Sequence, residues 1–195
     1  MIARNIVGRG LPPRPTCVKG GTVMEEKKEQ MLESIRVFSL PRYEEIPNVG
    51  LYLEQTSKYI SEYTAQLGDF SLTGSMISNY VKKGLVANPV KKQYSREQIA
   101  YLIFIAVGKS VLSMEDIRLL FQLQKESYTP QQAYDYFRTE LQNALLFVFG
   151  LKETLDTVGT TNTETKNLLR TAIITVAHKV FLDKAFAALH EGEPG

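Results

Sequence analysis

Apolar residues recur at helical spacing along most of this 195-residue chain. In the segment 96–108, for example, Ile99, Leu102, Ile103 and Ala106 fall on one stripe, as a helix with 3.6 residues per turn requires. No strand run of any length competes with this pattern. The sequence therefore predicts a helical protein.

Capping side chains stand at the points where several of these segments begin. Ser95 and Gln98 can form a capping box, as can Thr161 and Glu164 further along, and Thr73 is suited to cap the segment that follows it. The caps and the periodicity together predict helices at residues 25–37, 51–67, 73–83, 96–108, 113–125, 129–150 and 162–190.

The segment between Gly84 and Ser95 differs from its surroundings. Gly84 is a natural helix stop, and Asn88-Pro89 marks a turn. The segment is too short for a domain and fits a small loop or a two-stranded wing over 86–94. The predicted fold class is therefore all-α with a small β wing, followed by a C-terminal helical pair.

The chain divides into three regions. Residues 1–23 are rich in Gly, Pro and Arg, which predicts a disordered extension. Residues 24–127 are expected to form the main domain, and residues 128–195 a helical region for oligomerisation or effector binding. Because the segment 19–21 can be encoded by a ribosome-binding sequence shortly before a codon for Met24, we expect translation to start there. The alternative is a basic arm that reaches nucleic-acid phosphates.

Composition excludes several classes of protein. The chain has no run of about 18 or more apolar residues and no apolar core of a secretory signal at its start. Its one cysteine, Cys17, cannot form an intrachain disulfide or a multi-cysteine zinc site. His178 and His190 have no partner at metal-ligand spacing. We expect a cytoplasmic protein with no metal, no cofactor and no membrane contact.

Basic residues gather in one segment although the chain as a whole is nearly neutral, with a formal net charge of +2. Residues 73–96 hold five Lys and Arg and no acid, and residues 1–23 hold four more. The remainder has 14 basic residues (23 less 5 and 4) against 21 acidic ones. A basic patch on an acidic body is typical of a protein that binds a polyanion. The alternative is a solvated, lysine-rich loop.

The short helix 73–83 has two unlike faces. Ile77 and Tyr80 share an apolar face, while the opposite face carries small polar side chains. A recognition helix needs one face to dock and another to reach base edges, where Asn79 can pair with adenine. Flexible cations at the groove edges hold phosphates. The predicted DNA-binding residues are Thr73, Ser75, Ser78, Asn79, Lys82, Lys83, Lys91, Lys92, Tyr94 and Arg96.

The order of these features is specific. A helix is followed by a basic wing, by a helix that opens with Ser-Arg-Glu, and by a helix that opens with Ser-Met-Glu-Asp-Ile. The matching residues are Ile77, Tyr80, Lys82, Gly84, Leu85, Pro89, those at 94–99, Leu112, Ser113, Glu115, Ile117 and Arg118. Over about residues 72–121 this arrangement resembles the winged helix-turn-helix domain of MerR-type regulators, which implies binding to double-stranded DNA.

A second resemblance covers residues 38–121. The sequence segments that carry it are "LPRYEEIPNVGLYLEQ", "LTGSMISNYVKKGL" and "PVKKQYSREQIAYLI". They are similar to the bacterial YkrK-like family, a domain of unknown function for which DNA binding is inferred from a MerR-like fold. The resemblance implies no particular target.

The chain also departs from the MerR pattern. Ser78 and Asn79 stand where MerR proteins have Arg and Tyr, so the roles of those positions do not carry over. The helix at 51–67 and the connection at 68–72 are longer than their MerR counterparts. The long coiled-coil helix of MerR dimers does not follow the domain directly, and there is no cysteine cluster for metal sensing.

The C-terminal helices carry more apolar surface than one small domain easily covers. The segment 144–150 is apolar almost all round, and a helix over 162–190 would be about 43 Å long. We expect a homodimer, because repeated operator half-sites need two-fold symmetry. The alternatives are a pocket for a small-molecule effector, and helices that simply pack back on the main domain.

These observations predict a sequence-specific DNA-binding protein that regulates transcription in the bacterial cytoplasm. The sequence has no nucleophile with a base and no phosphate-binding loop after a strand, so we do not expect an enzyme. The alternative function is a helical adaptor that binds another protein, in which case the wing lysines only keep the surface solvated.

Overall fold

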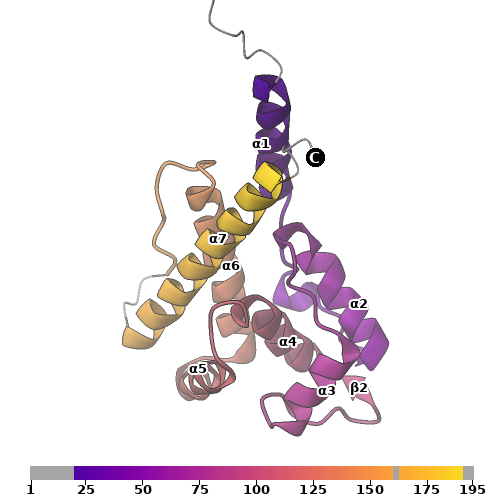
Figure 1. Cartoon of the computed structure of the whole chain (residues 1–195). Helices are drawn as coiled ribbons and strands as arrows, with labels where there is room; N and C mark the ends of the chain where they lie inside the picture. Colours follow the sequence, from indigo (N-terminus) through magenta and orange to yellow (C-terminus); the bar gives the residue numbers. More distant parts are fainter. Residues whose placement is uncertain (1–19, 160–162, 191–195) are drawn as a thin grey trace, which may run out of the picture.

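The computed structural model describes residues 20–159 and 163–190. These residues form seven α-helices, two 3-10 helices and a two-stranded antiparallel sheet (Figure 1). The broad all-α prediction is therefore confirmed. The α-helices are α1 (Gly20–Arg36), α2 (Leu53–Thr64), α3 (Gly74–Lys82), α4 (Arg96–Gly108), α5 (Met114–Ser127), α6 (Pro130–Val148) and α7 (Glu164–His190). The shorter elements are η1 (Tyr43–Glu45), η2 (Ala65–Leu67), β1 (Leu51–Tyr52) and β2 (Gln93–Tyr94).

Capping side chains fix most of the helix starts. At α4 the backbone N–H of Ser95 donates to Gln98 Oε1 at 2.8 Å, and the N–H of Gln98 donates to Ser95 Oγ at 3.4 Å. The same reciprocal geometry opens α5 and α6. The predicted cap Thr161 lies outside the described residues, and at α7 Thr163 Oγ1 accepts from the N–H of Lys166 at 3.3 Å.

Two predicted boundaries differ from the structure. The predicted helix 51–67 is a short strand, a helix and a 3-10 turn, because Leu51 and Tyr52 pair with residues some 40 positions further along, Leu51 with Tyr94 and Tyr52 with Gln93. Helical periodicity carries no trace of such a distant partner. In addition, α1 begins at Gly20, so its first turn includes residues 20–23 of the predicted extension. Residues 1–19 lie outside the described part.

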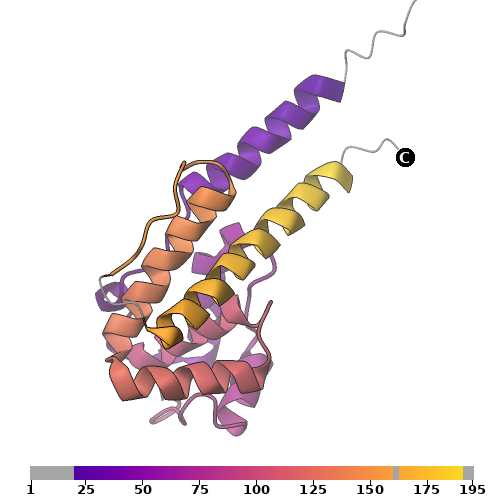
Figure 2. The ribbon, with the colours of Figure 1, turned by 90° about the vertical axis from the view of Figure 1, so that its left-hand side faces the viewer.

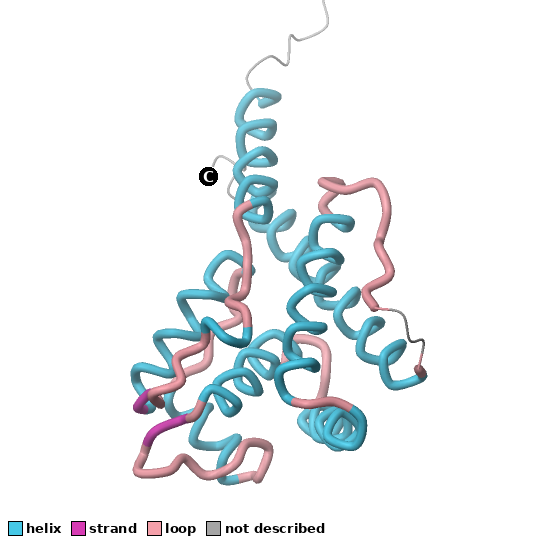
Figure 3. Tube along the Cα trace, turned by 180° about the vertical axis from the view of Figure 1, so that it is seen from behind, coloured by secondary structure: helices cyan, strands magenta, loops and turns pink. Residues whose placement is uncertain are grey.

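Helix α4 is the centre of the core. It is apolar all round, with Ile99, Leu102, Ile103 and Ile105 fully buried, and such a helix needs cover on every side. In the tube view of Figure 3, as in Figure 1, α2 and α3 lie on one side of it and α6 and α7 on the other. α4 therefore joins the basic segment to the C-terminal helices.

The C-terminal helices α6 and α7 run side by side in the same direction, because the loop between them returns along α6 (Figure 2). The middle of α7 is buried at Ile173, Val176, Ala177 and Val180. Its last turns project from the body beside α1 (Figure 2). In the described part of the chain, no helix is both long enough and apolar enough to cross a membrane.

Candidate nucleic-acid interface

The basic segment forms one end of the molecule. Helix α3 and the loop that leads from it to β2 lie together at the end opposite to the projecting turns of α1 and α7 (Figures 1 and 2). The two parts of the predicted site are thus on the same end of the fold. We call α3 and the loop 84–92 the basic edge.

Helix α3 presents its polar residues to solvent. Ser75, Ser78, Asn79 and Lys82 are all exposed, and at 3.6 residues per turn they fall within about 100° of the helix circumference. The opposite side is buried through Ile77 and Tyr80. The Tyr80 ring belongs to the core, and its burial raises the pKa of the phenol.

Both ends of α3 are fixed by local geometry. At its start, Thr73 Oγ1 accepts from the N–H of Met76 at 3.2 Å and lies 2.9 Å from Ser75 Oγ. At its end, Gly84 takes a positive φ of 69°, and the N–H of Leu85 donates to the carbonyl of Tyr80 at 2.9 Å. This is a Schellman motif, for which glycine is suited. Hydrogen bonds therefore fix both ends of this short helix.

The wing is the tip of a β-hairpin. Val90 and Gln93 exchange two backbone hydrogen bonds, of 3.1 and 2.9 Å, around the exposed pair Lys91 and Lys92. Both lysines have positive φ, 51° and 65°. Two such residues define a type I′ turn, which normally carries Asn-Gly. Each lysine therefore holds a conformation that costs an L-residue roughly 1 kcal/mol.

The loop before the hairpin is held from below by α4. Gln98 is 8% exposed, and its Nε2 donates to the carbonyl of Ala87 at 2.8 Å. Val86 is buried beside it in the core. The hairpin is thus positioned by β1 on one side and by α4 on the other.

The structure places two of the predicted contact residues within the fold. Tyr94 is only 4% exposed and belongs to the core, so its ring cannot reach a duplex. Arg96 donates from Nε to the carbonyl of Ile46 at 2.8 Å and from Nη2 to that of Glu44 at 3.0 Å. Its guanidinium also lies 5.8 Å from the Tyr43 ring centroid. Arg96 therefore holds the η1 loop against α4.

Arg118 on α5 is a cation that the predicted set omitted. It is exposed, and its Nη2 donates to the carbonyl of Lys83 at 2.9 Å. Lys83 Nζ in turn lies 3.8 Å from Met114 Sδ. Arg118 therefore stands at the C-terminal end of α3. Its place in the Ser-Met-Glu-Asp-Ile-Arg segment was the only sequence signal for this position.

Uncharged and acidic groups also border the basic edge. Val49, Tyr52 and Val90 are exposed large apolar side chains beside the hairpin, Val90 at 74%. On the other side, Glu54 Oε1 lies 3.2 Å from the position that a Cβ would take at Gly74. The start of α3 thus has an acid beside it and its end has cations. Among the described residues, no group of three or more His, Cys, Asp and Glu side chains could hold a metal.

The fold and this edge define a small helical protein that presents a short basic helix and a lysine-tipped hairpin. Residues 41–137, about half of the chain, match the family model "Domain of unknown function (DUF1836)". The predicted relationship to a domain of unknown function agrees with this match, whereas the MerR likeness stays a prediction. Neither the curated proteins nor the solved structures yield a match to the chain.

Proposed function

We propose that this protein binds double-stranded DNA through its basic edge and regulates transcription as a homodimer. In this proposal the domain is a MerR-like winged helix-turn-helix, with α3 as recognition helix and the Lys91-Lys92 hairpin as wing. Asn79 and the α3 serines face base edges in the major groove, and Lys82, Lys83, Lys91 and Lys92 hold phosphates.

The observation that carries the proposal is the free polar face of α3 next to the exposed lysine hairpin. No acid occurs between Asp69 and Glu97, and every predicted polar contact on α3 is exposed. The hairpin adds a second argument. Lysine is a poor choice for a type I′ turn, and residues kept in costly conformations tend to cluster at functional sites.

A salt series of DNA binding tests this proposal. Four phosphate contacts per protomer give a slope of about −3.6 for log K against log [salt], and a fifth from Arg118 gives about −4.5. Lys82→Glu with Lys91→Glu should weaken binding by at least about a hundredfold, because each lysine loses a charge-assisted contact. The matched control, Lys28→Glu with Lys58→Glu, carries the same charge change at exposed positions of α1 and α2 and should leave binding nearly unchanged.

Fluorescence anisotropy on genomic fragments of the source organism measures both quantities. Equal effects of the two charge-reversed variants would show that only net charge matters, and the basic edge would then not be the binding surface. Failure to bind any fragment at low salt would end the proposal.

The last turns of α7 support the homodimer. Leu182, Phe186 and Leu189 are spaced four and three residues apart and are each about half exposed, so they form one apolar stripe. We expect Phe186→Glu to convert a dimer into a monomer in light scattering and to weaken DNA binding without changing the folded structure. A wild-type monomer at micromolar concentration would contradict this part of the proposal.

The exposed side chains of Val49, Tyr52 and Val90 favour one alternative, an adaptor that binds another protein through the hairpin region. The same variants separate the two functions. In the adaptor, Val90→Ser weakens partner binding and the lysine reversals do not, whereas in the DNA-binding protein the lysine reversals have the larger effect.

A further inference from the structure

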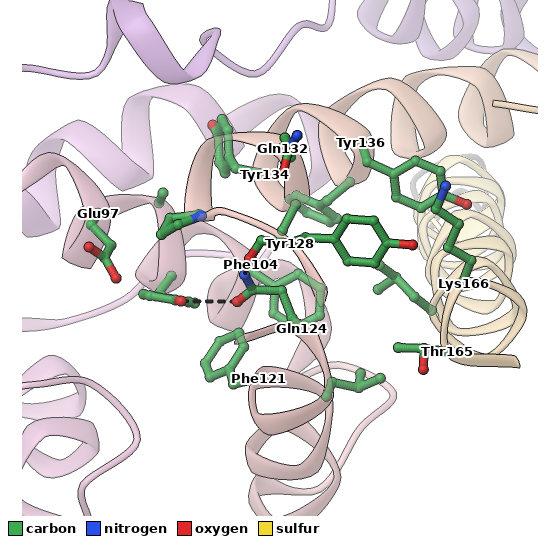
Figure 4. Close-up of a pocket in the computed structure, with 17 residues that line it drawn as sticks. Glu97, Phe104, Phe121, Gln124, Tyr128, Gln132, Tyr134, Tyr136, Thr165 and Lys166 are labelled. Carbon is green, nitrogen blue, oxygen red and sulfur yellow. Dashed lines mark hydrogen bonds between the residues drawn. The ribbon is translucent and has the colours of Figure 1, made fainter. Parts of the chain in front are cut away.

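A cavity of about 290 Å³ lies behind the basic edge, between α4, α5, α6 and the first turns of α7. Seven of the 17 residues that line the cavity are aromatic (Figure 4). They pack against one another in a continuous series, with Tyr101 4.6 Å from Phe121, Phe121 5.4 Å from Phe104, and Phe104 5.0 Å from Phe137 between ring centroids. A space of this size with apolar walls suits a small molecule.

The polar groups around the cavity are largely engaged in holding the fold. Tyr101 Oη donates to Gln124 Oε1 at 3.0 Å, and Gln124 Nε2 donates to the carbonyl of Tyr128 at 2.7 Å. Tyr136 Oη donates to Glu140 Oε1 at 3.0 Å. The wall thus offers ring surface more than free hydrogen-bonding groups, which favours an aromatic ligand.

Charges of opposite sign stand at the two ends of the cavity (Figure 4). Glu97 is exposed, so solvent screens its carboxylate. Lys166 is half-buried, and its Nζ lies 5.4 Å from the Tyr128 ring centroid and 5.3 Å from that of Tyr136. It also belongs to the first turn of α7, where the helix dipole favours negative charge. The stronger attraction is therefore for an anion at the Lys166 end.

We propose that this cavity binds a small aromatic anion, with the ring among the tyrosines and phenylalanines and the acid group at Lys166. The matched family region, residues 41–137, supplies most of the aromatic wall. Lys166 and Leu169 of α7 lie outside it. The C-terminal helix therefore provides the charge that selects the ligand.

The cavity walls are the same helices that support the basic edge. α5 lines the cavity with Leu120 and Phe121, and its Arg118, two residues before Leu120, donates to the carbonyl of Lys83. α4 lines it with Ala100, and its first turn holds the loop before the hairpin. A ligand that shifts either helix changes the position of α3 or the hairpin. We infer that the ligand regulates DNA affinity, and this part of the inference rests on the function proposed above.

Three probes with one ring system test the ligand class on the full chain. Isothermal titration should show that 1-naphthoate binds about tenfold more tightly than neutral 1-naphthamide, the ratio expected for one charge-assisted contact. The cation 1-naphthylmethylammonium should bind most weakly. Equal affinities, or tightest binding of the cation, overturn the anion assignment, and no binding of any probe overturns the site.

Variants locate the binding. Ala133→Phe fills the cavity and should abolish binding of all three probes. Lys166→Met should remove the preference for naphthoate and leave the amide unchanged, while Lys166→Arg should keep it. Lys179→Met, on the same helix but outside the cavity, is the matched control. If Lys166→Met and Lys179→Met have equal effects, with both proteins folded by circular dichroism, Lys166 is not the anion contact.

The regulatory part has its own readout. Saturating 1-naphthoate should change the dissociation constant for DNA by about fivefold or more, as is typical of coupled sites, and Ala133→Phe should abolish that change. Naphthoate binding with an unchanged DNA affinity overturns the regulation. Naphthoate binding by a protein that binds no DNA refutes the proposed function and its regulation but supports the ligand site.

Discussion

The basic edge and the contact between α6 and α7 differ in how their charged side chains are held in place. On the edge, charged side chains are exposed, and short-range backbone geometry fixes their positions: a cap, a Schellman motif and a two-residue turn. Between α6 and α7, the buried carboxylate of Glu140 pairs with the partly exposed Arg170, a side chain from a distant segment of the chain. Changes on the edge should therefore affect binding with little loss of stability, and changes between α6 and α7 should do the reverse.

The buried pair gives the largest expected effect. Glu140 is 1% exposed, Tyr136 donates to its Oε1, and Arg170 Nε lies 3.8 Å from its Oε2. Arg170→Met leaves the carboxylate buried without its cation, which should cost about 3–5 kcal/mol in the free energy of unfolding. Urea denaturation measures this loss.

A double variant is the control for the buried pair. Arg170→Met with Glu140→Met removes both charges and should restore part of the stability, because the carboxylate is no longer buried without its cation, while the Tyr136 hydroxyl and the carbonyl of Asp156 still lose their partners. The salt slope of DNA binding should stay the same in each folded variant. A cost below about 1 kcal/mol for Arg170→Met would mean that water reaches the carboxylate.

Two arginines sharpen the comparison because the sequence predicted only Arg96 as a DNA contact, whereas in the structure Arg96 bonds within the fold and Arg118 is exposed at the end of α3. Arg96→Gln removes charge-assisted hydrogen bonds to two carbonyls and should cost about 2 kcal/mol of stability with an unchanged salt slope. Arg118→Gln removes an exposed cation beside Lys83. It should change stability by less than about 1 kcal/mol and make the slope less negative by about 0.9.

Thermal denaturation and the salt series, run on both proteins, separate the two roles. A change of slope in Arg96→Gln would return Arg96 to the interface. A large loss of stability in Arg118→Gln would make Arg118 a structural residue.

These two arginines also illustrate what the sequence could predict. Helix bounds depend on caps and periodicity within a few residues, so α3 to α7 were located closely, as were the exposed polar residues of α3. The role of Arg96 depends on carbonyls 50 and 52 residues away, and the strand at Leu51 depends on Tyr94. No local pattern encodes such partners.

The cavity is even harder to predict from the sequence. Its wall combines side chains of four helices, from Glu97 to Leu169. Each of these residues taken alone has the pattern of a core position or a solvated charge. From the sequence, a pocket between the C-terminal helices was one of several alternatives. Only the packing of the helices shows which aromatic rings are in contact and that Lys166 lies beside them.

The hairpin should give a smaller effect of the opposite sign. Lys91→Asn with Lys92→Gly puts the preferred residues of a type I′ turn at the two positive-φ positions. The free energy of unfolding should rise by about 1 kcal/mol, because the gain from relieved strain exceeds the entropy cost of the glycine. The salt slope should become less negative by about 1.8, the equivalent of two phosphates.

Lys91→Gln with Lys92→Gln is the matched control for charge. It removes the same two cations but keeps side chains that are strained at positive φ, so it should share the loss of slope without the gain in stability. If the Asn-Gly variant is no more stable than wild type, the turn is not strained. Backbone strain then no longer supports a functional role for the hairpin.

The smallest effect concerns a tyrosine in the cavity wall. Burial, and then the negative charge of Glu97, raises the pKa of Tyr101 to about 12 from its ordinary value of 10.0. The folded state thus favours the neutral phenol. Its contribution to stability is complete below about pH 10 and is lost as pH rises from there towards 12. Because the ring is only partly buried, we expect less than about 1 kcal/mol rather than the full value of the shift.

Tyr101→Phe isolates this contribution from those of the other buried tyrosines. The variant should lose less stability than wild type between pH 9 and about pH 11.5, measured by urea denaturation at each pH. Ile77→Val, a change in the buried face of α3 away from the cavity, lowers stability without removing a titrating group, so its destabilisation relative to wild type should be the same at pH 9 and about pH 11.5. A bound aromatic anion would cover the Tyr101 ring further. If 1-naphthoate occupies the cavity, the wild-type protein should begin to lose stability at a higher pH. The pH at which Tyr101→Phe begins to lose stability should change less, which links the titration of Tyr101 directly to the proposed ligand site.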